Sequence, residues 1–447
     1  MDLITSAVVA AIGHGAPGHA PEAVTRHFQS LMRAIAKFDS AAAILAAIAA
    51  LEAAPANTEL QLALSAALAT ARAPDDMETL FAAQGLLDAL QGPAAPPPAP
   101  AAPAAAEKSA VVSNYAVVRA YFATDRRRDL GKPPAQRFSA ERSNDGTGGD
   151  AALAYGSCDI SIPRDHRMGQ LESPSLWRLE FREDPARHVV LLNAEVQDQE
   201  NFFAALKTQV RASAGKSAFV FVHGYNVTFE DAARRTGQMA YDLGFDGAPV
   251  FYSWPSQGDL ADYAVDENNI EWSTPHIAAF LADFLARSEA AHVYLIGHSM
   301  GNRGLARAVA ELMAAQPMLA QKITDIILTA PDIDAAIFQH DIAPKLAGAR
   351  NPVTLYASSE DLALAASKAV HGYPRAGDSG AGMLIVAGVE TIDATGVDTS
   401  FMKHAYFAEK RSALSDMFYL IRNNARADQR FLDPVDTPAG RYWTFKP

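Results

Sequence analysis

The stretch Val293-Tyr294-Leu295-Ile296-Gly297-His298-Ser299-Met300-Gly301 decides the fold of this chain. Its first four residues are apolar and predict a short buried strand, and the pattern of a helix follows over 302–315. Gly-x-Ser-x-Gly between a strand and a helix is typical of a turn so sharp that the serine is strained and its neighbours must be small. Such a turn lifts the Ser299 hydroxyl clear of the sheet, which makes Ser299 a candidate nucleophile.

Strand-like and helical segments alternate on both sides of this turn. Short apolar runs predict strands over 117–122, 189–192, 218–222, 249–252, 323–328, 353–356 and 389–392. Helices are expected over 229–243, 275–287, 302–315 and 412–423. Short strands that are apolar on both faces and alternate with helices indicate a mostly parallel α/β sheet, covered by helices on both faces.

The first 92 residues have a different composition, rich in Ala and Leu and nearly free of strand signals. Helical spacing predicts a small all-helical bundle with helices over 21–38, 41–53, 58–71 and 76–90. Residues 93–106 are only Pro and Ala, which favours an extended spacer over a surface loop within one domain. We therefore expect a helical domain over 1–92, a linker over 93–108 and a catalytic domain over 109–447.

The whole-chain composition excludes several classes of protein. With 49% hydrophobic and 20% charged residues, the 447-residue chain is of ordinary globular composition. A formal net charge of -13 argues against binding to nucleic acid or to anionic lipid. Cys158 is the single cysteine, so no intrachain disulfide forms. Without a signal-like N-terminus or a membrane-length apolar stretch, we expect a cytoplasmic protein with no transmembrane segment.

Acyl transfer on a serine needs hydrogen-bond donors for the oxyanion. One donor is expected to be the backbone N–H of Met300, directly after the nucleophile. The second is expected from the loop His223-Gly224-Tyr225-Asn226, which ends the strand over 218–222. We assign the Tyr225 N–H, with Asn226 next, and Gly224 lets the backbone approach the substrate. The alternative is that His223-Gly224 only makes a tight turn.

The acid and the base of a triad should follow the serine in that order. Asp361 follows the strand over 353–356 and is our candidate for the acid. Its rivals are the adjacent Glu360 and the pair Asp332 and Asp334, which otherwise cap and pack a loop near the site.

His404 lies after the last predicted strand and before the last helix, where a triad base belongs. The competitor His371 comes too soon after the acid and before the final strand. His298, beside the nucleophile, and Trp254, after the strand over 249–252, are further candidates for contact with substrate. Alternatively, His298 packs in the turn and Trp254 packs beneath the site.

Other chemical motifs are incomplete. Gly215-Lys216-Ser217 resembles the end of a phosphate-binding loop, but Val210 stands where that motif needs glycine. No His-Glu-x-x-His and no Cys/His ligand set occurs. We therefore expect neither a metal nor an organic cofactor.

The motifs together resemble a bacterial group of α/β hydrolases long catalogued as a domain of unknown function. The similarity covers roughly residues 115–425. It rests on Tyr121-Phe122-Ala123-Thr124-Asp125-Arg126, Tyr155-Gly156 with Ile162-Pro163, Phe221-Val222-His223-Gly224-Tyr225-Asn226, Tyr252-Ser253-Trp254-Pro255-Ser256, Gly297-His298-Ser299-Met300-Gly301-Asn302-Arg303, Ala330-Pro331-Asp332-Ile333-Asp334, Ser358-Ser359-Glu360-Asp361 and His404-Ala405-Tyr406-Phe407. The resemblance implies an esterase-like or lipase-like activity without a cofactor, and implies nothing about residues 1–92.

These features predict a serine hydrolase that cleaves carboxylic esters through an acyl-enzyme on Ser299. The expected substrate is a small-molecule or lipid ester. An acyltransferase, thioesterase or peptidase on the same fold is one alternative. Another is an effector that a protein partner recruits through residues 1–92, with the helical domain as an interaction module.

Overall fold

The chain divides into two compact units, one made mainly of residues 1–97 and the other mainly of residues 98–447. We treat each unit by itself. The computed structural model describes residues 3–13, 22–38, 40–54, 57–71, 79, 83, 86, 114–143, 153–168, 171–173, 183–257, 263–359, 364, 367, 371–380, 382–396 and 413–446. The linker over 93–108 and most of the helix expected over 76–90 lie outside these residues, so the boundaries at 92 and 108 stay predictions.

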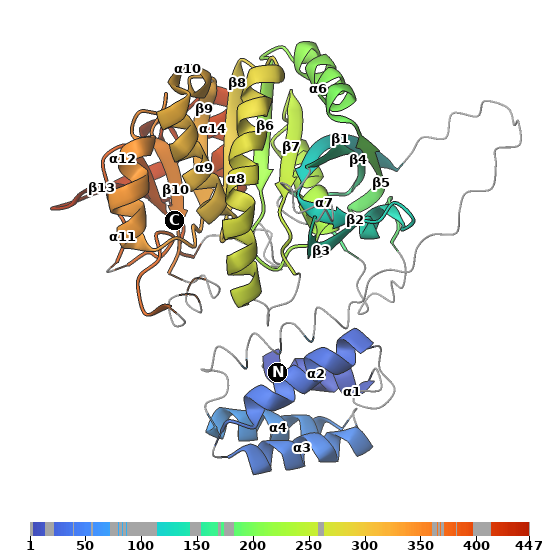
Figure 1. Ribbon diagram of the computed structural model, residues 1–447. Helices are drawn as coiled ribbons and strands as arrows, with labels where there is room; N and C mark the ends of the chain where they lie inside the picture. The colour runs from blue at the N-terminus through green and yellow to red at the C-terminus, as the bar shows by residue number, and fades with distance from the viewer. Residues whose placement is uncertain are drawn as a thin grey trace, which may run out of the picture. The chain divides into compact units, whose positions relative to one another are not determined.

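The described residues of the first unit form four helices with a common apolar core (Figure 1). They are α1 (Leu3–Gly13), α2 (Glu22–Ile35), α3 (Ala41–Ala53) and α4 (Thr58–Thr70). Apolar residues three or four positions apart share a helix face and fill the core, among them Ile4, Val8, Phe28, Leu31, Ile44, Ile48, Leu51, Leu64 and Leu68. Periodicity does not predict α1, because Leu3–Gly13 has no charged residue to mark an outer face.

Among the described residues of the second unit, eleven strands form one sheet (Figure 1). In spatial order they are β12 (Leu432–Thr437), β13 (Gly440–Phe445), β11 (Val389–Asp393), β10 (Val353–Ala357), β9 (Ile323–Thr329), β8 (His292–His298), β6 (Ser217–Val222), β7 (Ala248–Ser253), β1 (Tyr115–Thr124), β4 (Ala154–Pro163) and β5 (Val190–Gln197). The pairs from β13 through β1 are parallel. β1–β4, β4–β5 and β12–β13 are antiparallel. A separate hairpin joins β2 (Arg126–Arg128) to β3 (Phe138–Arg142).

Helices cover both faces of the sheet. The longer ones are α6 (Gln199–Ala212), α7 (Phe229–Asp242), α8 (Tyr263–Arg287), α9 (Gly301–Ala315) and α14 (Ala413–Asn423). Shorter segments are η2 (Pro134–Gln136), α10 (Pro317–Ala320), α11 (Ala335–Ile337), η5 (Phe338–Ile342), α12 (Ala343–Leu346) and η6 (Ala427–Gln429). The predicted fold class, a mostly parallel sheet between helical layers preceded by a helical region, is confirmed.

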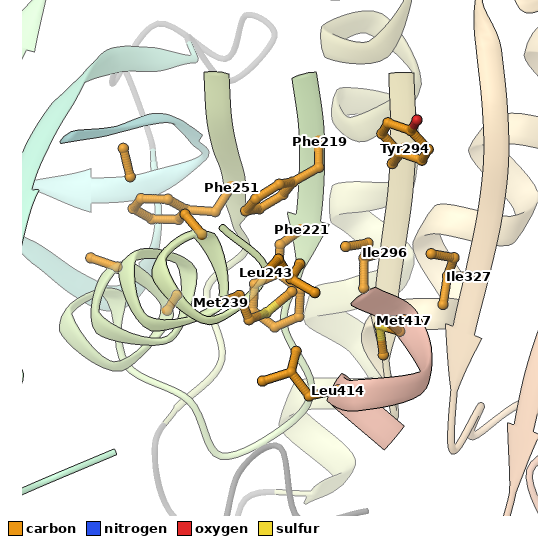
Figure 2. Packing of buried hydrophobic residues seen from close by; sticks show 14 of the residues in the cluster. Phe219, Phe221, Met239, Leu243, Phe251, Tyr294, Ile296, Ile327, Leu414 and Met417 are labelled. Atoms are coloured by element: carbon orange, nitrogen blue, oxygen red, sulfur yellow. The ribbon is translucent and has the colours of Figure 1, made fainter. Parts of the chain in front are cut away.

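The two faces of β6 and β7 use alternate residues, as the strand period requires. Figure 2 shows Phe219 and Phe221 packed with Met239 of α7 and with Leu414 of α14 on one face. On the other face, the ring of Tyr252 lies 5.7 Å from that of Phe280 in α8.

The helix predicted over 275–287 is wrong at its start. α8 begins at Tyr263 and includes Pro275 in its interior. Pro275 has no N–H for the carbonyl four residues earlier, a loss that normally ends or bends a helix. Burial of Ile270, Ile277 and Phe280 offsets that loss, because tertiary packing outweighs intrinsic propensity.

Within the described residues, none of the helices has the length and apolar character needed to cross a membrane.

A buried histidine joins the segment after β4 to α7. His166 has a side chain that is 2% exposed, and both ring nitrogens bind carboxylates. Nδ1 lies 2.7 Å from Glu172 Oε2, and Nε2 lies 2.7 Å from Asp242 Oδ1. Burial opposes the charged ring, but the two carboxylates outweigh burial and raise the pKa of His166 to about 9.

The raised pKa predicts a loss of stability at alkaline pH. The folded chain holds the His166 proton more tightly than the unfolded chain does, so this contribution is complete below about pH 6.5 and is lost as pH rises through about 9. We expect His166→Gln to flatten the fall in unfolding free energy between pH 7 and 10, measured by urea denaturation. Parallel pH profiles for wild type and variant would show that His166 does not carry this dependence.

Candidate active site

Ser299 sits at the turn between β8 and α9 in a strained backbone conformation. Its φ is +47°, a region that residues with a side chain rarely adopt. A Cβ at Gly297 would lie 2.0 Å from Asn302 Oδ1, and one at Gly301 would lie 2.1 Å from the His223 carbonyl oxygen. Steric crowding therefore explains why glycine stands at both 297 and 301, as the sequence motif predicts.

The end of β9 holds this turn in place. The Ser299 N–H donates to the Thr329 carbonyl at 3.0 Å, and Asn302 Nδ2 donates to the same carbonyl at 3.0 Å. The Asp332 N–H donates to the Ser299 carbonyl at 3.2 Å. Both backbone polar groups of Ser299 are thus satisfied, and the rigid strand end fixes the strained residue.

The loop after β6 closely approaches Ser299. A Cβ at Gly224 would lie 3.0 Å from Ser299 Cβ and 2.7 Å from His298 Nδ1, so only glycine fits there. Asn226 also has a positive φ, +58°. The Asn226 N–H donates to Asp266 Oδ2 at 3.4 Å. This bond engages the N–H group that we ranked second to that of Tyr225 as an oxyanion donor. Among the described residues, the Met300 N–H has no acceptor.

Asp266 of α8 anchors this loop from below. Its carboxylate accepts from Ser256 Oγ at 2.6 Å and from the Gln257 N–H at 2.8 Å, in addition to Asn226. Ser256 Oγ in turn accepts from the Val227 N–H at 3.1 Å. Burial raises the pKa of Asp266 to about 6, while these hydrogen bonds act in the opposite direction.

Arg126, at the start of β2, is a second buried anchor. Its guanidinium donates to Ser253 Oγ at 2.8 Å, to the Ser256 carbonyl at 3.0 Å and to the Val227 carbonyl at 2.7 Å. Another bond reaches the Ser139 carbonyl at 3.2 Å. Burial lowers the pKa of Arg126 to about 10, which leaves the group charged at neutral pH. The guanidinium thus joins the ends of β1 and β7 to the loop.

Trp254 and His298 both lie close to the same loop. Trp254 is fully buried, donates from Nε1 to the His223 carbonyl at 2.7 Å and stacks on the His223 ring with centroids 5.2 Å apart. This position matches the alternative that Trp254 packs beneath the site. His298 is half-buried and lies against Gly224.

The residues proposed as acid and base, Asp361 and His404, lie outside the described residues, as does Glu360. Asp332 is buried, and its carboxylate accepts from Arg375 Nε at 2.8 Å, Ser367 Oγ at 2.5 Å and Arg303 at 3.0 Å. These three donors commit its oxygens to a structural network.

Asp334, an alternative acid, and His371, the alternative base, also have hydrogen-bond partners. Asp334 Oδ1 accepts from the N–H groups of Ala336 and Ile337 and so caps α11. His371 Nε2 lies 2.7 Å from Glu267 Oε1, and its Nδ1 lies 2.7 Å from the Ser367 carbonyl. His371 therefore faces α8 and its own loop.

Sequence reasoning did not identify Arg126 or Asp266 as part of the site. Arg126 belongs to a motif that we quoted for its resemblance, but no spacing rule links it to a loop about 100 residues away. Asp266 lies in a helix whose start was predicted too late, so it was not placed near the loop.

Within the described part of the chain, no three His, Cys, Asp or Glu side chains are grouped so that they could hold a metal ion.

Comparison with known families now adds to this geometry. The family described as alpha/beta hydrolase of unknown function (DUF900) matches residues 198–423, just over half of the chain. The chain belongs to this family. The matched region contains the loop after β6, the turn at Ser299 and the proposed triad residues. The fold and the predicted family resemblance are therefore confirmed, and the protein is an α/β hydrolase.

A second family, described as the Het-E N-terminal domain, matches residues 1–98 of the hydrolase. A search of curated proteins found no match. Residues 1–98 include all four helices described in the first unit, and the two family matches do not overlap.

Three solved structures are weakly similar to the hydrolase. Lipase B of Aspergillus fumigatus has a TM-score of 0.28 and 14% identity, with coverage of 88% of this chain and 77% of that one. A fungal esterase from Rhizomucor miehei has a TM-score of 0.28 and 11% identity, with coverage of 62% and 81%. Esterase B from Lactobacillus rhamnosis has a TM-score of 0.23 and 11% identity, with coverage of 53% and 71%. At these TM-scores, the likenesses carry no argument.

The anchor at Asp266 predicts a pH-dependent stability of the same sign as that of His166, but over an acidic range of pH. Because its folded pKa, about 6, lies above the unfolded value near 3.8, the folded chain binds this proton more tightly. Stability from this group therefore rises as pH falls from about 6 to 4, by roughly 2–3 kcal/mol at most. Asp266→Asn should remove that rise in urea denaturation. An unchanged pH profile in the variant would contradict the assignment.

Proposed function

We propose that the hydrolase cleaves carboxylic esters through an acyl-enzyme intermediate on Ser299. The observation that carries this proposal is the strained backbone of Ser299 at a turn that the loop after β6 closely approaches. A Cβ added at Gly224 would lie only 3.0 Å from Ser299 Cβ. Strain of this kind at a non-glycine residue is concentrated at functional sites. The Ser299 side chain is not fully sealed, since the residue is 8% exposed.

The proposed reaction begins with attack of Ser299 Oγ on the ester carbonyl carbon while His404 accepts the hydroxyl proton. The N–H groups of Met300 and Tyr225 stabilise the oxyanion of the tetrahedral intermediate. His404 then returns the proton to the departing alcohol. Water, deprotonated by His404, then attacks the acyl-enzyme; the acyl–Oγ bond breaks, the acid leaves and His404 returns the proton to Ser299 Oγ. Asp361 holds the imidazole in the required tautomer throughout.

The contacts of the rival residues support Asp361 and His404. The carboxylate of Asp332 already accepts from Arg375, Ser367 and Arg303, and that of Asp334 caps a helix. His371 is paired with Glu267. A triad acid must accept from the imidazole, so an occupied carboxylate is poorly suited to the role.

Our proposed substrate contacts are Gly224 and His298, which border Ser299, and Asn226, which lies in the same loop as Gly224. Trp254 shapes the site from beneath through its contact with His223. The substrate class is an ester small enough, or a lipid extended enough, to reach a serine that is largely buried. The same acyl-enzyme serves an acyltransferase, a thioesterase or a peptidase. Product analysis with added alcohols or amines discriminates among these reactions.

The hydrolase should turn over short p-nitrophenyl esters, and a fluorophosphonate should label Ser299. Ser299→Ala and His404→Ala should each lose at least about a thousandfold in kcat/KM, and the double variant should lose little more, because the two residues act as one unit. Ser415→Ala, in α14, is the matched serine control. Folded wild-type protein that neither turns over an ester nor accepts the label would refute the proposal.

Asp361→Asn and Asp332→Asn separate the candidate acids. We expect Asp361→Asn to lower kcat with little change in unfolding free energy. Asp332→Asn should mainly lower stability, because it removes a charge held by two arginines. A large loss of kcat in Asp332→Asn, with kcat unchanged in Asp361→Asn, would assign the acid to Asp332.

We further propose that residues 1–92 act as an interaction module that places the hydrolase near a protein partner. These residues have their own apolar core and match a family separate from the catalytic one. The Pro/Ala run after them would serve as a tether, which raises the local concentration of the enzyme at a bound partner.

This module is tested by comparing proteins that copurify with the full chain and with a chain that begins near Ala110. The shorter chain should keep its ester hydrolysis and lose specific partners. Identical partner sets for the two chains would rule out a module in residues 1–92.

A further inference from the structure

His223 lies between the buried Arg126 and the Gly224 peptide of the loop that approaches Ser299. It is fully buried at the end of β6. Its Nδ1 lies 2.8 Å from the Gly224 carbonyl oxygen, and its Nε2 lies 3.1 Å from Ser253 Oγ. Burial first, and the positive charge of Arg126 second, hold the pKa of His223 well below its usual range, so the ring is neutral at pH 7.

The hydrogen-bond partners fix which nitrogen of this neutral ring carries the proton. The Gly224 carbonyl is only an acceptor, so Nδ1 must donate to it. Nε2 is then an acceptor, and the Ser253 hydroxyl donates a hydrogen bond to it. Ser253 Oγ is free to donate in this direction because it accepts from Arg126 Nε at 2.8 Å. Three hydrogen bonds thus form one directional chain from Arg126 to Gly224.

This chain ends on the peptide that carries the proposed oxyanion donor. The Gly224 carbonyl and the Tyr225 N–H belong to the same peptide unit, which is planar, and in a trans peptide the two groups point in opposite directions. A bond that holds the carbonyl toward the His223 ring therefore sets the direction of the Tyr225 N–H as well. Glycine at 224 would otherwise let this peptide rotate easily.

We propose that His223 is a positioning residue, whose Nδ1–H holds the Gly224 carbonyl so that the Tyr225 N–H faces the acyl oxygen on Ser299. Ser253 and Arg126 keep His223 in the tautomer that this requires. The inference rests on the proposed ester hydrolysis at Ser299. It gives a function to the Ser253 of the Tyr252–Ser256 segment, which the catalytic scheme itself does not use.

Two substitutions at His223 separate positioning from simple packing. In His223→Asn, the side-chain nitrogen takes the place of Nδ1 and can still donate to the Gly224 carbonyl. In His223→Gln, the amide reaches the place of Nε2, keeps a partner for Ser253 and loses the donor to Gly224. Both variants remove the imidazole ring and its stacking on Trp254, so each is a control for the other's effect on packing.

We expect His223→Gln to lower kcat for ester hydrolysis by about a hundred- to a thousandfold with little change in KM, the loss typical of a misplaced oxyanion donor. His223→Asn should retain kcat within about tenfold of wild type. Thermal unfolding of both variants checks that their stabilities are matched. Equal losses of kcat in the two variants, or a larger loss in Asn, would overturn the proposal.

A second measurement does not depend on activity. In protein labelled with ¹⁵N-histidine, the resonance that disappears in His223→Asn identifies His223, and its coupling pattern reports the tautomer. An Nδ1–H tautomer that is lost in Ser253→Ala is the expected result, and an Nε2–H tautomer in wild type would overturn the proposal. If wild type were inactive but showed the Nδ1–H tautomer, the ester hydrolysis would fail while the arrangement around His223 stood.

Discussion

The close approach of two turns, one after β6 and one after β8, is the constraint on which the catalytic unit depends. β6 and β8 are parallel neighbours, so their carboxyl ends lie side by side at one edge of the sheet. Each turn has a glycine where the other comes close, since a Cβ at Gly301 would strike the His223 carbonyl and one at Gly224 would press on Ser299. The sheet therefore brings the nucleophile and the oxyanion loop together before any side-chain chemistry is considered.

Buried polar groups then give the loop one conformation. Loops without such anchors are the mobile parts of most folds. Here Arg126 donates to the Val227 carbonyl of the loop and to the Ser256 carbonyl after β7, and Asp266 accepts from the Asn226 N–H of the loop. A buried charge costs free energy unless it is fully hydrogen-bonded, so these groups are costly alone and useful as a connected set. Preorganised donors of this kind are the usual source of oxyanion stabilisation.

The sequence alone predicts the elements with the strongest local signals. Continuous apolar runs located β6, β8 and β9 within one or two residues, because a strand buried on both faces leaves little ambiguity. Prediction from sequence failed for helices whose formation depends on tertiary contacts. α8 continues through Pro275, and α1 is apolar on all sides, so neither shows the pattern of an isolated amphipathic helix.

The same distinction applies to the site. Ser299, Met300 and Gly224 follow from short motifs with a steric reason that the structure makes visible. Arg126 and Asp266 are joined to them only in space, and no spacing along the chain marks that contact. Asp361 and His404 come from chain order and from the occupied side chains of their rivals, and they stay predictions.

The most direct measurement is a crystal structure of the hydrolase after reaction with a phosphonate ester analogue. We expect a covalent bond to Ser299 Oγ and a phosphoryl oxygen within about 2.7–3.1 Å of the backbone nitrogens of Met300 and Tyr225. We also expect His223 Nδ1 to bind the Gly224 carbonyl in the adduct. A phosphoryl oxygen directed away from both nitrogens, or an adduct on another residue, would contradict the proposed mechanism.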